Sequence, residues 1–292
     1  MDEVALVRRF NRTVTQRIGV LNDAFLARGR PLGQARVLWE IGADGLDVRA
    51  LRSRLDLDSG YLSRLLRSLE ADGLVAVESH GADGRVRSAR LTEAGLAELA
   101  VVNERSDELA ASMLEPLSAR QRERLVAAMS EVERLVIASM VRVEPRDPGH
   151  PDARSCLRAY YAELATRFEG GYDPGITLPV RDDDMTPPAG VLLVASLHGD
   201  PVGCGVVKLR DPEPAEIKRM WVAPTVRGLG LGRRILAALE SRALAAGASQ
   251  VRLETNRALR EAIAMYHACG YTEVAPFNDE PYAHHWFAKP LP

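Results

Sequence analysis

The sequence predicts a multidomain chain, with a mostly α domain over residues 1–140 followed by an α+β domain over residues 141–292 in which helices flank a mixed sheet. Through most of the first half, apolar residues recur at helical spacing, and only one short β feature interrupts them. The second half alternates short strand-like segments with turns and two amphipathic helices. A length of 292 residues with 46% hydrophobic residues suits two domains that each bury a core.

Charge and cysteine content narrow the functional classes. The formal net charge is −2, so the chain as a whole does not have the excess positive charge of a protein that binds polyanions. The three cysteines are isolated and lack metal-ligand spacing, which predicts a reduced, cytoplasmic protein without a metal site. We expect no membrane partner and no secretion signal, since no apolar run is long enough to span a bilayer and the first residues lack a signal-peptide core.

Residues 48–72 predict two helices joined by a tight turn. The first covers residues 48–55, the turn 56–58, and the second 59–72, where Asp58 or Ser59 can cap the helix. Leucines at helical spacing would face the core, and Gly73 would end the helix. A hairpin follows, because residues 74–79 and 85–91 alternate in strand fashion around Gly-Ala-Asp-Gly. This order of elements is that of a winged helix-turn-helix.

The pattern LxxLLRSLEADGLV followed by DGRVRSARLTEAG resembles the MarR family of transcriptional regulators over nearly the whole first half. The resemblance implies a homodimer on double-stranded DNA with a pseudo-palindromic operator, the second helix in the major groove and the wing in the minor groove. The groove-facing candidates that it implies are Ser59, Tyr61, Ser63, Arg64 and Arg67, and the wing candidates are Arg85 and Arg87.

The charge of this region leaves an alternative open. Residues 47–90 contain eight arginines against seven acidic residues, so the region is barely positive, and it could serve dimerisation instead of DNA binding. A dimer is expected in either case. A long first helix that ends near Gly29 and further helices over residues 92–114 and 118–139 exceed what one small winged helix needs.

In the second half, residues 152–168 predict a helix, and three adjacent strands over residues 191–197, 201–209 and 216–222 follow a loop rich in glycine and proline. The last of these strands ends at Val222 and leads through Arg-x-x-Gly-x-Gly, residues 227–232, into an amphipathic helix. Free backbone N–H groups at a helix N-terminus, beside glycines without Cβ, favour a phosphate or pyrophosphate ligand. No Lys-Ser/Thr follows the glycines, which excludes a nucleotide-triphosphatase loop.

This loop, together with EIKRMWVAP before it, RLET after the helix and EAIAMYHACGYTEV further on, resembles the GNAT family of N-acetyltransferases from about Met140 to the end of the chain. The resemblance implies acetyl-CoA as co-substrate, a primary amine as acceptor and direct transfer between them. The residues that it assigns to acetyl-CoA are Met220, Trp221, Val222, Arg227, Gly228, Leu229, Gly230, Leu231, Gly232, Arg233, Asn256 and Tyr266.

The resemblance also implies catalytic roles. Glu216 stands where the family places a base, and burial would raise its pKa; pairing with Lys218 or an arginine is the alternative. Tyr266 matches the tyrosine that protonates the thiolate of CoA, with a packing role as the alternative. Leu259 replaces an asparagine common in the family, and Asn256 could substitute for it. The acceptor candidates are Glu254, Lys218, Tyr282 and His284.

Three functions follow from these observations. The first is a bifunctional MarR-type regulator and N-acetyltransferase. The second is a transcription factor that senses acyl-CoA without turnover, and the third is an acetyltransferase that uses the winged helix only as a dimer scaffold.

Overall fold

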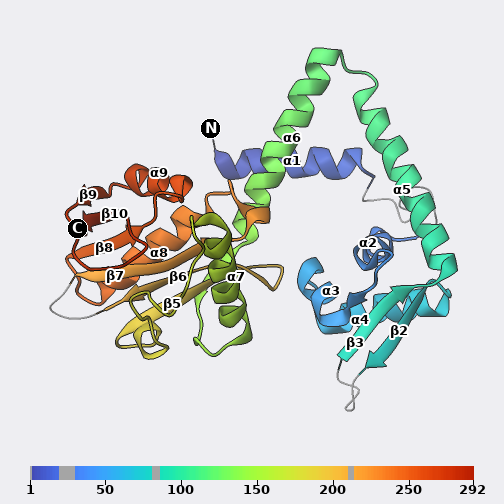
Figure 1. Cartoon of the computed structure of the whole chain (residues 1–292). Coiled ribbons are helices and arrows are strands. Elements are labelled where there is room, and N and C mark those ends of the chain that lie inside the picture. Colours follow the sequence, from blue (N-terminus) through green and yellow to red (C-terminus); the bar gives the residue numbers. More distant parts are fainter. Residues whose placement is uncertain (1, 20–29, 81–85, 210–213) are drawn as a thin grey trace. The chain divides into compact units, whose positions relative to one another are not determined.

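A computed structural model describes residues 2–19, 30–80, 86–209 and 214–292. The chain divides into two compact units, Met1–Ser130 and Glu131–Pro292, and each is described by itself (Figure 1). The division falls inside a helix, α6, that spans Ala119–Met140. Its last turns belong with the second unit, where Arg134 donates to the carbonyl of Gly228 at 2.7 Å. The predicted domain boundary after residue 140 stays a prediction.

The first unit is mostly helical and has one small sheet. Its helices are α1 Glu3–Arg17, α2 Leu32–Ile41, α3 Val48–Leu55, α4 Ser59–Ala71, α5 Glu93–Leu114 and the first part of α6. Its strands are β1 Leu46–Asp47, β2 Val75–His80 and β3 Val86–Leu91, in the order β1-β3-β2 with antiparallel pairing. Helix, turn, helix and hairpin therefore occur as predicted.

Side-chain caps fix where these helices begin. Asp47 accepts hydrogen bonds from the first turn of α3, Asp58 from the Tyr61 N–H of α4, and Thr92 from the Gly95 N–H of α5. Between α3 and α4, Asp56 adopts a left-handed conformation with φ 49°, which ends α3 and starts the turn. The leucine face of α4 is buried against α2, α3 and the sheet.

The first helix is shorter than the sequence predicted. α1 ends at Arg17, and Gly19 follows with φ 70°, a conformation that glycine adopts without a Cβ penalty. Residues 20–29, over which the helix was expected to continue, lie outside the described residues. The tip of the predicted wing, including Arg85, lies outside them as well.

The second unit contains a seven-stranded sheet in the order β4-β5-β6-β7-β8-β10-β9. Its strands are β4 Arg142–Pro145, β5 Gly190–Leu197, β6 Asp200–Lys208, β7 Ala215–Val222, β8 Gln250–Thr255, β9 Thr272–Val274 and β10 His285–Pro290. Its helices are α7 Pro151–Arg167, α8 Leu231–Ala245 and α9 Arg260–Ala268, besides the end of α6. The sheet is mixed, because β7 and β8 are parallel and the other pairs are antiparallel.

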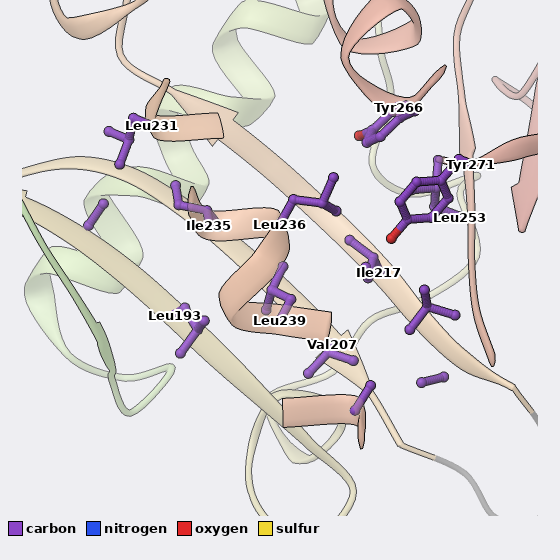
Figure 2. Close-up of a cluster of buried hydrophobic side chains, with 14 of the residues drawn as sticks. Leu193, Val207, Ile217, Leu231, Ile235, Leu236, Leu239, Leu253, Tyr266 and Tyr271 are labelled. Atoms are coloured by element: carbon purple, nitrogen blue, oxygen red, sulfur yellow. The ribbon is translucent and has the colours of Figure 1, made fainter. Parts of the chain in front are cut away.

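Helices cover both faces of this sheet. Along β5, Leu193 and Ala195 pack in the cluster that contains Ile235, Leu236 and Leu239 of α8 (Figure 2). The alternate residues Leu192 and Val194 pack instead with Ala153, Cys156 and Leu157 of α7. A strand buried on both faces explains why β5 is a continuous apolar run.

The parallel strands β7 and β8 separate soon after they meet. They pair only at Ala215 with Val251 and at Glu216 with Arg252, although both continue beyond these residues. In the same stretch β7 also leaves its regular register with β6, between Cys204 and Val206. The opening between the diverging strands positions the candidate site.

Candidate active site and candidate nucleic-acid interface

The loop between β7 and α8 presents backbone donors at a helix N-terminus. A short 3₁₀ turn over Pro224–Val226 follows β7, and Gly228 and Gly230 have φ of 80° and 74°. Gly230 is the N-cap of α8 and no side chain caps the helix there. The first N–H groups of α8 therefore have no side-chain acceptor and can bind an anion.

A groove of about 580 Å³ extends along this loop. Ten of the twelve residues predicted to hold acetyl-CoA line it: Met220, Trp221, Val222, Arg227, Gly228, Gly230, Leu231, Gly232, Arg233 and Tyr266. The other two do not line the groove. Leu229 packs against the core beneath, and Asn256 lies in the neighbouring pocket.

Glu163 of α7 organises one wall of the groove. Its carboxylate accepts from Arg227 at 2.5 Å, from the Trp221 indole N–H at 2.9 Å and from Arg167 at 3.2 Å. Arg227 also donates to the Val222 carbonyl at 3.0 Å, so its side chain folds back over the loop. Nothing in the motif Arg-x-x-Gly-x-Gly indicates this partner, because Glu163 belongs to a distant helix.

A second pocket, of about 110 Å³, is lined by residues of both diverging strands. Three of the four predicted acceptor residues, Lys218, Glu254 and Tyr282, line it. The predicted His284 does not, and its backbone N–H bonds to the Thr255 carbonyl at 2.9 Å. Aromatic side chains form much of the wall, namely Tyr160, Phe168, Tyr172 and Tyr282.

The groove and the pocket meet at a shared set of residues. Tyr160, Leu164, Met220, Leu259, Ala262 and Tyr266 line both. Tyr266 is 5% exposed, and burial, followed by the negative charge of Glu254, raises its pKa. Burial likewise raises the pKa of Tyr160. Both hydroxyls therefore hold their protons at neutral pH and can donate them where the two cavities meet.

Glu216 lines neither cavity. Its carboxylate accepts two hydrogen bonds from Arg252, at 2.6 and 3.0 Å, and lies 3.5 Å from the Lys218 ammonium. Burial disfavours its charged form, but the charges of Lys218 and Arg252 outweigh burial and lower the pKa of Glu216. The expectation that its pKa is raised is therefore wrong, and the ion pair foreseen as the alternative is present.

Glu254, at the end of β8, lies at the wall of the second pocket, which Glu216 does not reach. It lines the pocket, its side chain is 9% exposed, and its carboxylate lies 2.5 Å from the Lys218 ammonium. The Asn278 amide donates to its other oxygen at 3.3 Å. Glu254 is thus a buried carboxylate beside Tyr266, oriented by two partners.

Asn256 is engaged within the protein. Its amide donates to the Tyr282 carbonyl at 2.8 Å, and its oxygen accepts from the Ala258 N–H at 2.9 Å. These bonds tie the end of β8 to the loop before β10. Its contact with pantetheine stays a prediction, and Leu259 contributes an apolar surface to both cavities.

Sequence reasoning missed Tyr160 and Arg219. Tyr160 lies in the helix α7, and only the adjacent aromatics Tyr160 and Tyr161 mark this segment. Arg219 lines the second pocket although strict alternation along β7 would place it opposite Lys218. Its position follows from the register shift between β6 and β7, and β7 itself contains no glycine or proline that would mark it.

In the first unit, the predicted DNA-contacting residues occupy the outer face of α4. Ser59, Tyr61, Arg64 and Arg67 are exposed and Ser63 is half-buried. The Arg64 guanidinium lies 5.7 Å from the centre of the Tyr61 ring, and Arg67 donates to the Ser63 carbonyl at 3.2 Å. Arg87 of β3 is exposed too. These side chains form one polar face opposite the buried leucines.

Two kinds of feature are absent from the described part of the chain. No group of three or more His, Cys, Asp or Glu residues there could hold a metal ion. Among the same residues, none of the helices has the length and apolar character needed to cross a membrane.

Comparison with known proteins identifies both regions. The MarR family matches residues 28–86, and the acetyltransferase (GNAT) family matches residues 157–271. An IAA acetyltransferase of Azospirillum brasilense is 44% identical over 88 residues, which are 30% of this chain and 57% of that protein. An uncharacterised N-acetyltransferase of Schizosaccharomyces pombe is 33% identical over 97 residues, 32% of this chain and 60% of that protein.

The chain thus spans less than two thirds of either relative. Among solved structures, an acetyltransferase of the GNAT family from Staphylococcus aureus Mu50 is 16% identical, with a TM-score of 0.42 over 52% of this chain and 99% of that one. The MarR match covers the helix-turn-helix region, and the GNAT match covers the central strands β5 to β8 with the loop and helices that line the groove. The chain therefore contains a region that matches the MarR family and, after it, a region that matches the acetyltransferase (GNAT) family.

Proposed function

We propose that the second unit transfers an acetyl group from acetyl-CoA directly to an amine. The observation that carries this proposal is the meeting of two cavities at Tyr266 and Tyr160, one of them ending at an uncapped helix N-terminus. A donor in the groove and an acceptor in the pocket would then place thioester and amine side by side. Holding two reactants in this way removes much of the entropic cost of reaction.

The groove fits the charge and shape of acetyl-CoA. The N–H groups of the loop and of the first turn of α8 would hold the pyrophosphate, and the exposed Arg233 adds a positive charge beside them. Beyond Glu216, β7 does not pair with β8, so this edge of β7 is available to the amide groups of the pantetheine arm. Gly232 lacks a Cβ where one would lie 2.9 Å from the Met265 sulfur.

The proposed chemistry needs a base and an acid. The ammonium of the acceptor first loses a proton, and its nitrogen then forms a bond to the thioester carbon while the carbon–sulfur bond breaks. Glu254, which lines the acceptor pocket, would take the proton from nitrogen, and Tyr266 would donate one to the departing thiolate. In net terms, one proton leaves the acceptor for solvent and one moves from nitrogen to sulfur.

The assignment of the base predicts a difference between two glutamates. Glu254→Gln should lower kcat/KM by about 100-fold, because an amide cannot accept the proton. Glu216→Gln, which removes a carboxylate from the same ion-pair network outside the pocket, should lower it by less than about tenfold. Steady-state kinetics at saturating acetyl-CoA measures both. A larger loss in the Glu216 variant would return the role of base to Glu216.

Release of the CoA thiol tests the function as a whole. The full chain is incubated with acetyl-CoA and amines of several classes, including amino acids, polyamines, aminoglycosides and lysine peptides. We expect thiol release to depend on one class of amine. If acetyl-CoA binds in calorimetry and no amine gives release, the domain is an acyl-CoA sensor and the proposal fails.

We also propose that the first unit binds operator DNA as a homodimer. The polar face of α4 and the MarR-family match support DNA binding. For the dimer, α6, which continues from the first unit into the second, exposes large apolar residues at helical spacing, and a second copy of the chain would cover them: Val126, Met129, Val132, Leu135, Val136 and Met140. The free thiols Cys156, Cys204 and Cys269 fit a cytoplasmic location.

DNA binding predicts the effect of removing two arginines. The double variant Arg64→Gln and Arg67→Gln should weaken binding to the promoter of its own gene on the order of 10- to 100-fold and flatten the salt dependence of binding. The control, Arg158→Gln with Arg242→Gln, makes the same charge change at exposed positions of the other unit. Electrophoretic mobility shifts report binding, and sedimentation should show an unchanged dimer. Equal binding by both double variants would favour the scaffold function.

A further inference from the structure

Arg219 is directed into the acceptor pocket by an irregular strand. It has φ 54°, a left-handed conformation unusual for a residue other than glycine, and the register of β7 with β6 shifts at the same place. As a result, the four consecutive residues Ile217–Met220 all line the pocket, where a regular strand would turn every second one away. Bulges of this kind re-aim a side chain, and strained residues persist where a function needs them.

The guanidinium of Arg219 has neutral contacts only. It donates to the Val180 carbonyl at 3.2 Å and lies 5.0 Å from the centre of the Tyr161 ring. No carboxylate of the described residues lies within ion-pair distance of it, whereas Lys218 beside it has two. Burial lowers the pKa of Arg219, and an arginine remains charged at neutral pH even so. A half-buried cation without a counter-ion favours an anionic ligand.

The same pocket carries negative charge as well. Glu254 and Glu280 line it, and Glu280 is fixed by the Leu178 N–H at 2.9 Å. A ligand that complements both signs has an ammonium or amine near the carboxylates and a carboxylate near Arg219. Only the amine end needs to reach Tyr266, where the acetyl group would arrive.

Aromatic rings supply the remaining wall. The rings of Tyr172 and Tyr282 have centroids 4.9 Å apart, and Phe168 lies 5.8 Å from Tyr172 and 5.6 Å from Tyr282. Such a cluster favours an apolar or aromatic side chain of the ligand over a polar one.

We infer that the acceptor is a free α-amino acid with an apolar or aromatic side chain, whose carboxylate is bound by Arg219. The inference rests on the proposed acetyltransferase function and names its substrate class. The acid's amino nitrogen would attack the thioester while Glu254 takes its proton. Arg219 is a specificity-determining residue in this arrangement, because it binds a part of the acceptor that does not react.

Matched pairs of acceptors test the inference on the wild-type chain. L-Phenylalanine is compared with 2-phenylethylamine, and L-leucine with 3-methylbutylamine, each pair differing only in the carboxylate. We expect kcat/KM to be on the order of 100-fold higher for the amino acid of each pair, since a site built for a polar group rejects an analogue that lacks it. Equal values within each pair would overturn the inference while leaving the acetyltransferase function intact.

Variants of Arg219 give a second test of the inference. Arg219→Gln should lower kcat/KM for L-phenylalanine by about 100-fold and change kcat/KM for 2-phenylethylamine by less than about threefold. For Arg219→Lys, kcat/KM for L-phenylalanine should lie between the values of the wild type and of Arg219→Gln. Arg242→Gln, an exposed arginine on α8, is the control. Calorimetric binding of acetyl-CoA confirms that each variant is folded. Equal losses for both acceptors would assign Arg219 a structural role, and absence of turnover with every amine would contradict the proposed function itself.

Discussion

Replacing Tyr266 by phenylalanine is expected to lower kcat by about 100-fold while the dissociation constant of acetyl-CoA stays within about threefold. The ring remains, so the packing of Tyr266 against Tyr271 and Phe287 is kept. What is lost is the hydroxyl that we propose donates a proton to the departing thiolate. The effect should therefore fall on turnover and not on binding of the donor.

Tyr271 provides the matched control. Its ring centroid lies 5.8 Å from that of Tyr266, it is 2% exposed, and its hydroxyl donates to Glu240 at 2.9 Å, yet it lines neither cavity. Tyr271→Phe should lose about 1 kcal/mol of the free energy of unfolding and keep kcat. Equal kcat in the two variants would show that the Tyr266 hydroxyl has no catalytic part.

The raised pKa of Tyr266 also predicts a pH dependence. A tyrosine acid of ordinary pKa would lose its proton near pH 10, and a raised pKa moves that loss to higher pH. The kcat of the wild type should then rise with pH as the acceptor amine deprotonates and show no fall up to about pH 10. A fall beginning near pH 8 would contradict the assignment.

The second large effect is expected at Gly230. Alanine there must adopt φ 74° at a cost of about 1–2 kcal/mol, and the loop can escape this strain only by turning its N–H groups away from the groove. Gly230→Ala should therefore weaken acetyl-CoA binding by about tenfold or more, as measured by calorimetry.

Gly247 provides a control that distinguishes the effect of backbone strain from the loss of acetyl-CoA binding. It has φ 88°, no atom lies within 4 Å of a Cβ built on it, and it follows the other end of α8; no neighbour would contact a Cβ at Gly230 either. Gly247→Ala should cost a similar free energy of unfolding and leave the dissociation constant of acetyl-CoA unchanged. A similar loss of affinity in both variants would mean that general destabilisation, and not the loop, explains the result.

Features encoded locally could be read from the sequence. The caps at Asp58 and Thr92, the hairpin of the wing and the turn from β7 into α8 each depend on a few neighbouring residues. The match of both regions to their families follows from the same local patterns. Most of the residues predicted to hold acetyl-CoA line the groove because they are consecutive along one strand, loop and helix.

Features that depend on distant partners could not be read in this way. The charges of Lys218 and Arg252 lower the pKa of Glu216 against the effect of burial, and Arg252 lies opposite Glu216 only because β7 and β8 pair there. Tyr160 reaches the meeting point of the cavities through the packing of α7 on the sheet. The Arg219 side chain departs from the usual alternation of side chains along a strand because the register between β6 and β7 shifts there, and no residue of β7 indicates this shift.

We propose that donor and acceptor occupy adjoining cavities at the same time. The decisive experiment measures the initial rate of thiol release while the concentrations of acetyl-CoA and an accepted amine are varied together. Lines that intersect in a double-reciprocal plot are predicted, since transfer requires both reactants bound, and none of the three cysteines lines either cavity among the described residues. Parallel lines, with an acetylated protein detected by mass spectrometry, would show transfer through the enzyme and contradict the account.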